Sequence, residues 1–142
     1  MRVSFAGDRR ALAAPTVRRV VGAVLEGERS VETIMTVTFL SAARMRTLNR
    51  KSFDHDRASD VIAFRLPHAD EVFGDVYVCP AEARRSARRY RVPVREELIR
   101  LVIHGTLHVL GYDHPAGESR IHSSMWARQE RYVVAVQSGA AP

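Results

Sequence analysis

The sequence contains a single cysteine, Cys79, so the chain cannot form an internal disulfide. It also lacks any apolar run as long as a membrane-spanning helix requires, and its opening residues, Met1-Arg-Val-Ser, do not begin a signal-peptide pattern. These absences argue against a disulfide-stapled secreted scaffold and against an integral membrane protein. We therefore expect a protein of a reducing compartment, with the cytoplasm as the simplest location.

Lysine is nearly absent, because only Lys51 among the 22 basic residues is not an arginine. The 16 acidic residues leave a formal net charge of +6, which favours a polyanionic partner such as RNA. The abundance of arginine, alanine and valine has a second explanation, since a GC-rich genome shifts composition in the same direction. Charge alone leaves both explanations open.

The hydrophobic spacing predicts one α+β domain over residues 1–142, a small mixed β-sheet packed with helices, with a frayed tail at 138–142. The expected order is β-α-β-α-β-β-α-α-α. Residues 51–59 should form a loop, and residues 67–70 should connect two antiparallel strands. We expect strands at 3–5, 33–40, 60–64 and 72–78, and helices at 15–25, 41–49, 80–90, from after Pro93 to 110, and 118–136.

The clearest chemical signal is the segment His104-Gly-Thr-Leu-His108-Val-Leu-Gly111-Tyr-Asp-His114. His104 and His108 are four residues apart and share one face of a helix that is apolar on nearly all sides. Gly111 can adopt the left-handed conformation that ends a helix, which lets His114 fold back towards the other two. Three histidines would hold one Zn²⁺ per chain and leave the fourth tetrahedral position to a zinc-bound water, as in catalytic sites.

The alternative is that His104 and His108 form an incidental pair, each imidazole hydrogen-bonded to a neighbour. Burial in an apolar helix costs free energy unless the imidazoles are satisfied, and zinc would satisfy both. The spacing is that of the metzincin proteases, but Gly105 replaces their catalytic glutamate. Peptide hydrolysis would then lack a proton shuttle, whereas RNA can use its own 2′-hydroxyl as nucleophile. Asp113 is a candidate base, or it orients His114 or caps the turn.

Arginines are concentrated just before the motif helix. On a helix they would form two adjacent stripes whose phosphate contacts position RNA without reading its sequence. The alternative is a solvated face. Tyr90 and Phe53 are candidates for stacking on bases. The proposed RNA-binding stripes consist of Arg84, Arg85, Arg88 and Arg89.

These segments together resemble the YbeY family, bacterial zinc endoribonucleases that mature ribosomal RNA. The family signature H-G-x-L-H-L-x-G-Y-D-H matches residues 104–114 except at Val109. Two further blocks are similar in order and spacing. They are Leu48-Asn49 followed by Ser59-Asp-Val-Ile-Ala-Phe64, and Phe73-Gly-Asp-Val-Tyr-Val78.

The resemblance implies zinc on His104, His108 and His114, and a cytoplasmic endoribonuclease that matures the 3′ end of small-subunit rRNA and acts in ribosome quality control. The expected partners are RNA, chiefly rRNA of the small subunit, and ribosomal proteins, with neither DNA nor a membrane. Many members carry an arginine where this chain has Phe53; Arg50 and Arg57 are the candidates to replace it. Two other functions remain open, a metalloprotease and a non-catalytic, zinc-containing ribosome-assembly factor.

Overall fold

The structure is a computed structural model that describes residues 2–8, 10–30, 32–53, 59–68, 71–112 and 124–139. Within these residues a four-stranded mixed sheet and five helices follow each other in the order that the hydrophobic spacing predicts. The strands are β1 (Arg2–Gly7), β2 (Thr33–Phe39), β3 (Val61–His68) and β4 (Glu71–Val78). The helices are α1 (Ala14–Gly27), α2 (Ala42–Phe53), α3 (Pro80–Tyr90), α4 (Val94–Val109) and α5 (Ser124–Ser138).

The strand order in the sheet is β1-β2-β4-β3. The first three of these strands run parallel, and β3 pairs antiparallel with β4, as the short connection between them predicts. Side chains of β2 alternate between buried and half-buried positions, with Met35, Val37 and Phe39 in the core. The period-2 pattern therefore identifies the face of the sheet that the helices cover.

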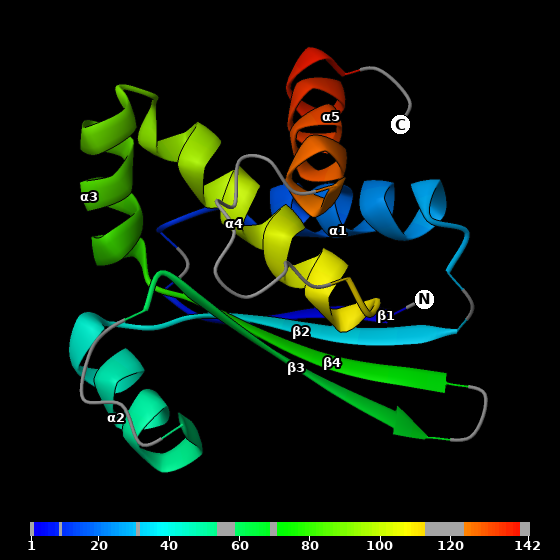
Figure 1. The fold of residues 1–142 in the computed structure, drawn as a ribbon, viewed down its shortest axis with the longest axis horizontal. Coiled ribbons are helices and arrows are strands. Elements are labelled where there is room, and N and C mark those ends of the chain that lie inside the picture. The colour runs from blue at the N-terminus through cyan, green and yellow to red at the C-terminus, as the bar shows by residue number, and fades with distance from the viewer. Residues whose placement is uncertain are drawn as a thin grey trace.

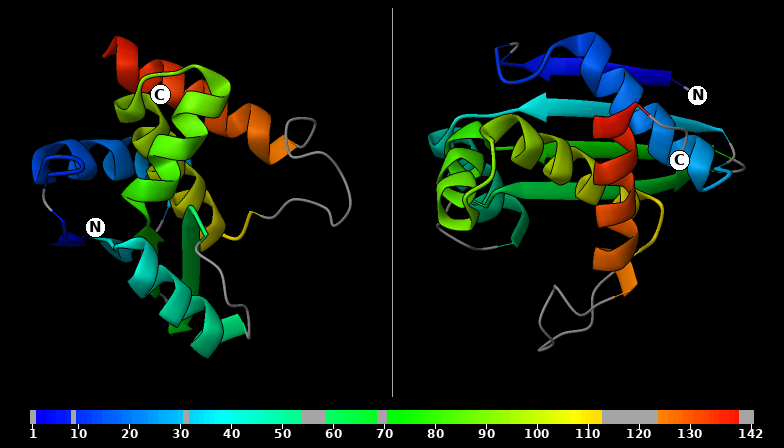
Figure 2. Two further views of the ribbon diagram at one scale, coloured as in Figure 1. Left: turned by 90° about the vertical axis from the view of Figure 1, so that its left-hand side faces the viewer. Right: turned by 90° about the horizontal axis from the view of Figure 1, so that it is seen from above.

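The helices cover the two faces of the sheet unequally (Figures 1 and 2). On one face α4 packs on β3 and β4 with α1 beside it, and α5 lies over both helices as an outer layer. On the opposite face α2 covers a smaller cluster around Met45, Ile62 and Cys79. Because α4 lies between the sheet and α5, it is buried along nearly its whole length.

Two expected boundaries are wrong by four residues each. Strand β3 continues to His68 rather than ending at Phe64, because a proline at position 67 costs no ladder hydrogen bond on an edge strand. Helix α2 continues to Phe53, so residues 51–53 are not part of the expected loop; Arg50 and Lys51 lie in its last turn, where positive charge favours a helix C-terminus. Residues 118–123 of the expected last helix lie outside the described residues.

No helix in the described part of the chain is both long and apolar enough to cross a membrane.

Candidate functional site

The two helical histidines of the motif converge on each other. His104 is buried and His108 is half-buried on α4, and their Nε2 atoms lie 3.0 Å apart. Their ring centroids are separated by 4.6 Å, with the rings inclined at 76°. The prediction that residues four apart present their imidazoles on one helix face is confirmed.

Gln129 on α5 determines which nitrogen of His104 carries its proton. The Gln129 Nε2 donates to Glu130 Oε2 at 3.1 Å, so the amide oxygen Oε1 is turned towards His104 Nδ1, at 2.6 Å. A carbonyl oxygen only accepts, so Nδ1 must donate the hydrogen. The lone pair of His104 is therefore on Nε2, on the side that faces His108.

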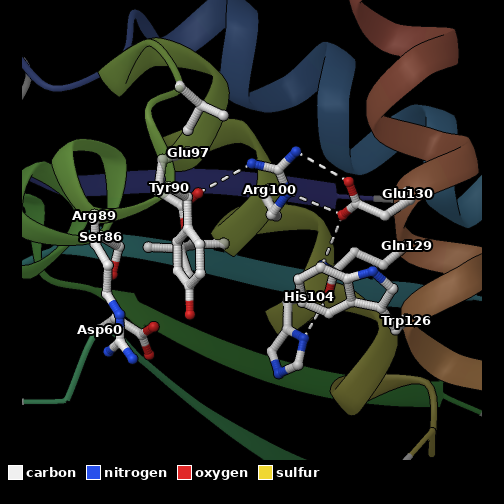
Figure 3. Close-up of a pocket in the computed structure, with 12 residues that line it drawn as sticks. Asp60, Ser86, Arg89, Tyr90, Glu97, Arg100, His104, Trp126, Gln129 and Glu130 are labelled. Atoms are coloured by element: carbon white, nitrogen blue, oxygen red, sulfur yellow. Dashed lines mark hydrogen bonds and ion pairs between the residues drawn. The ribbon is translucent and has the colours of Figure 1, made fainter. Parts of the chain in front are cut away.

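Arg100 supports the orientation of Gln129 and His104 through its ion pair with Glu130 (Figure 3). Its guanidinium donates twice to Glu130, at 2.9 and 3.0 Å, and once each to Glu97 and Glu96, at 3.0 and 3.1 Å. Burial would lower the pKa of Arg100, but the hydrogen bonds and charge of these carboxylates outweigh it and raise the pKa. A continuous chain of contacts thus runs from Arg100 through Glu130 and Gln129 to His104.

Helix α4 ends as the position of Gly111 predicts. Gly111 has a φ of +102°, its N–H donates to His108 O at 2.9 Å, and Tyr112 N–H donates to Leu107 O at 3.0 Å. These two bonds form a Schellman motif. The chain therefore turns sharply at Gly111, two residues before Asp113 and three before His114, both of which lie outside the described residues. Among the residues that are described, no three His, Cys, Asp or Glu side chains are grouped to hold a metal, so the third ligand and the base stay predictions.

Glu28, at the end of α1, anchors the turn that follows the histidine pair. Its side chain is 7% exposed and accepts hydrogen bonds from Tyr112 Oη at 2.5 Å, from Arg128 Nη1 at 3.0 Å and from Tyr132 Oη. Burial would raise the pKa of Glu28, but the hydrogen bonds from the two tyrosines and Arg128 outweigh it and lower the pKa. Glu28 thereby joins α1 and α5 to the turn beyond His108.

Replacing Glu28 by alanine is expected to lower the free energy of unfolding at pH 7 by roughly 1.5–3 kcal/mol, since the buried Tyr132 and the half-buried Tyr112 and Arg128 lose a charged acceptor. A carboxylate whose pKa is lower in the folded chain stabilises the fold above its unfolded pKa, about 4.3, and this contribution disappears as pH falls through the folded-state pKa. The difference between wild type and variant should therefore shrink below about pH 4. Denaturant unfolding of wild type and variant at several pH values measures this difference. Glu26→Ala is the control, because Glu26 is exposed.

Gly105 lies where α4 touches the sheet. A Cβ at this position would come within 2.5 Å of Val76 Cγ1 and 3.3 Å of Val61 Cγ2. The distance to Val76 Cγ1 is too short, and the β-branched Val76 has little freedom to move aside. A glutamate at position 105 would therefore point into the sheet instead of towards the histidines. The missing protease base follows from the packing of this helix.

A pocket of about 530 Å³ opens beside His104 between α3, α4 and α5. Arg89 and Tyr90 line it from α3, Trp126 and Gln129 from α5, and His104 from α4 (Figure 3). Asp60, directly before β3, also lines it. Of these residues, Trp126, Gln129 and Asp60 were not predicted as site residues, because nothing in the local pattern connects them to the histidines.

The four arginines of the predicted RNA-binding stripes are all exposed on α3, whose opposite face is buried through Pro80, Ala83 and Ala87. Arg89 lines the pocket beside His104, whereas Arg84 lines a separate hollow of about 390 Å³. Arg85 pairs with Glu82 at 3.3 Å on the surface. The predicted exposure is confirmed; binding of RNA by these side chains stays a prediction.

Two of the sequence segments that carry the family resemblance are in contact in the structure. Asn49 is 2% exposed, and its Nδ2 donates to Ser59 Oγ at 2.9 Å. This bond joins the Leu48-Asn49 block to the start of the block that forms β3. Arg50 is exposed on α2, and Arg57 lies outside the described residues, so the replacement for the family arginine stays open.

Comparison with known proteins gives the same family as the sequence blocks described above. Residues 6–137 match the family model described as endoribonuclease YbeY. A protein named endoribonuclease YbeY from Thermotoga petrophila is 36% identical over 70% of this chain and 65% of its own length. A protein of the same name from Chlorobium phaeobacteroides is 32% identical over 82% of this chain and 83% of its own length. The matched part thus spans just under two thirds of the Thermotoga protein and most of the Chlorobium protein.

The fold is similar to the solution structure of a Thermotoga maritima protein. The superposition has a TM-score of 0.69 at 28% sequence identity and covers 96% of this chain and 90% of the other.

Proposed function

The chain belongs to the YbeY endoribonuclease family, and from this membership we propose that it is a zinc-dependent endoribonuclease of single-stranded RNA. Its proposed task is rRNA processing in the cytoplasm, at the 3′ end of small-subunit rRNA, together with ribosome quality control. The observation that carries this proposal is the convergence of two histidine Nε2 atoms, one of them oriented by Gln129.

The chemistry of this donor pair fits zinc. His104 and His108 would hold the ion through Nε2, because His104 Nδ1 is already committed to Gln129. His114 is the proposed third ligand, three residues beyond the turn at Gly111. When bound, zinc supplies a Lewis acid that polarises a phosphodiester and makes water more acidic.

The remaining roles fall to the protein and the substrate. Gly105 stands where the metzincin pattern has its catalytic glutamate, so the 2′-hydroxyl of RNA is the proposed nucleophile and Asp113 the candidate base. The guanidinium of Arg89, at the pocket beside His104, is placed to hold a phosphate near the histidine pair. Arg100 is paired with three carboxylates and therefore supports the site without contacting RNA.

Replacing Gln129 by alanine removes the acceptor that orients His104. Loss of such an outer partner typically weakens metal binding by about 10–100-fold, and we expect an effect of this size on zinc affinity. Competition with a chelating dye measures it. Gln137→Ala is a matched control, because Gln137 lies on the same helix and donates to Glu96, not to a histidine. Equal zinc affinities of both variants and wild type would show that Gln129 does not orient a ligand.

Replacing Arg85 and Arg89 together by alanine should weaken RNA binding about equally for all sequences and flatten its dependence on salt. Each lost phosphate contact removes roughly one released counterion from the slope. Zinc content should not change, because neither residue is a proposed ligand. The control is Arg18→Ala with Arg131→Ala, which removes the same charge from exposed positions on α1 and α5. An affinity and slope equal to wild type would mean that the stripes are only a solvated face.

Single-turnover assays with labelled RNA and with a peptide library separate the proposed enzyme from its rivals. We expect cleavage of single-stranded RNA and none of the peptides, since a general base cannot be accommodated at position 105. Cleavage of peptides would instead establish a metalloprotease. Tight RNA binding with no cleavage of either polymer would identify an assembly factor.

A further inference from the structure

We infer that the pocket between α3, α4 and α5 binds one unpaired RNA base next to the phosphate at the histidine pair. This inference rests on the proposed function, since it gives the same site a subsite for its substrate. Four observations support it: two aromatic rings in the pocket, its size, the carboxylates in its lining and its position.

The first observation is the pair of aromatic side chains. Tyr90 is 63% exposed at the end of α3, and half-buried Trp126 lines the pocket from α5. Figure 3 shows both rings at the pocket, with the His104 ring lying below the gap between them in this view. The Arg89 guanidinium lies 5.6 Å from the Tyr90 ring centroid. Aromatic rings with an adjacent arginine are the surface on which unpaired bases stack.

The size of the pocket and the carboxylates in its lining favour a base over a phosphate. Its volume of about 530 Å³ falls within the roughly 300–1,000 Å³ of small-ligand pockets. Three carboxylates line it, those of Asp60, Glu97 and Glu130, together with the guanidinium groups of Arg89 and Arg100; Arg100 is paired with both Glu97 and Glu130. Carboxylates repel a phosphate, whereas they accept hydrogen bonds from the amino and imino groups of a base.

The position of the pocket relates the base to the reaction. His104 is both a wall of the pocket and one of the two converging histidines. A base seated between Tyr90 and Trp126 therefore places its own phosphate close to the histidine pair, and Arg89 lies at the same opening. The pocket thus selects RNA whose base is unpaired at the cleavage position, because a base within a duplex cannot enter it.

Trp126 is the only tryptophan of the chain, so its fluorescence reports directly on the pocket. The experiment titrates the full chain with a non-cleavable 2′-O-methyl oligoribonucleotide and with an abasic oligomer of equal length and charge. We expect the first to quench Trp126 and the second to bind roughly 5- to 150-fold more weakly without quenching, the range for loss of one stacked base. Tyr90→Ala should weaken binding of the base-containing oligomer by a similar factor and leave the abasic one unchanged.

Two further variants serve as controls. Tyr90→Phe keeps the ring and should bind as wild type does. Val134→Ala removes an apolar side chain that is 67% exposed on α5, the helix of Trp126, and should also have no effect. Because Tyr90 is exposed, its replacement leaves the core intact, and circular dichroism verifies this.

The base subsite is overturned if both oligomers bind equally and neither changes Trp126 emission, or if Tyr90→Ala binds the base-containing oligomer as wild type does. Failure of the proposed function is distinguishable, because binding of a non-cleavable oligomer does not require catalysis. Quenching without any RNA cleavage by the protein would support the subsite and contradict the enzyme. Cleavage without quenching would support the enzyme and contradict the subsite.

Discussion

Replacing His108 by alanine is expected to abolish RNA cleavage and to reduce bound zinc far below one ion per chain. The loss should exceed the roughly 10–100-fold that removal of an outer partner costs, because a direct ligand disappears. His108→Ala also leaves the buried His104 Nε2 without its neighbour, 3.0 Å away in the wild type. Thermal stability should therefore fall as well.

His114→Ala provides the comparison. It should weaken zinc binding while both helical histidines stay in place, so its melting temperature should fall less than that of His108→Ala. His68→Ala, at the end of the edge strand β3, removes a histidine outside the proposed ligand set and should retain zinc and activity. Wild-type zinc content and melting temperature in both His108→Ala and His114→Ala would mean that the histidine pair is incidental.

Gly105→Glu, which restores the glutamate of the metzincin pattern, is expected to give an unfolded protein and no peptidase. Even Gly105→Ala places a Cβ 2.5 Å from Val76 Cγ1. Overpacking of this kind costs about 1–3 kcal/mol, which is more than the ~1 kcal/mol that alanine gains over glycine in a helix. A glutamate adds the burial of a carboxylate between α4 and the sheet, which is far more costly.

Denaturant unfolding of Gly105→Ala, Val76→Ala and the double variant tests this explanation. Val76→Ala opens space for the new methyl group, so the two changes should be less destabilising together than the sum of their separate effects. Additive effects would show that Val76 is not the obstacle. A folded Gly105→Glu protein that cleaves peptides would contradict both the packing argument and the choice of RNA as substrate.

Those parts of the fold that depend on local spacing could be predicted from the sequence. Alternation at Met35, Val37 and Phe39 identified β2, and Pro15 and Pro80 marked the first turns of α1 and α3. The convergence of His104 and His108 follows from helical geometry alone. Each of these inferences depends on neighbours in the chain, for which periodicity is a sufficient guide.

The contacts that orient the site could not be predicted, because they join residues far apart in sequence. Gln129 lies 25 residues from His104, and Glu28 lies 84 residues from Tyr112. A glutamine on a helix and a glutamate at a helix end are ordinary surface residues until the fold buries them. The absence of a glutamate at position 105 was visible in the sequence, but its cause, the contact with Val76, was not.

The most direct test of a metal-dependent ribonuclease is cleavage of a labelled single-stranded RNA before zinc is removed, after it is removed and after it is restored. Elemental analysis of the same samples gives the zinc content, and His108→Ala, purified in the same way, excludes a contaminating nuclease. We expect close to one zinc per chain in the active samples, loss of cleavage in the stripped sample and recovery with restored zinc. Cleavage by the stripped protein and by His108→Ala at the rate of the zinc-containing wild type would contradict the proposed function.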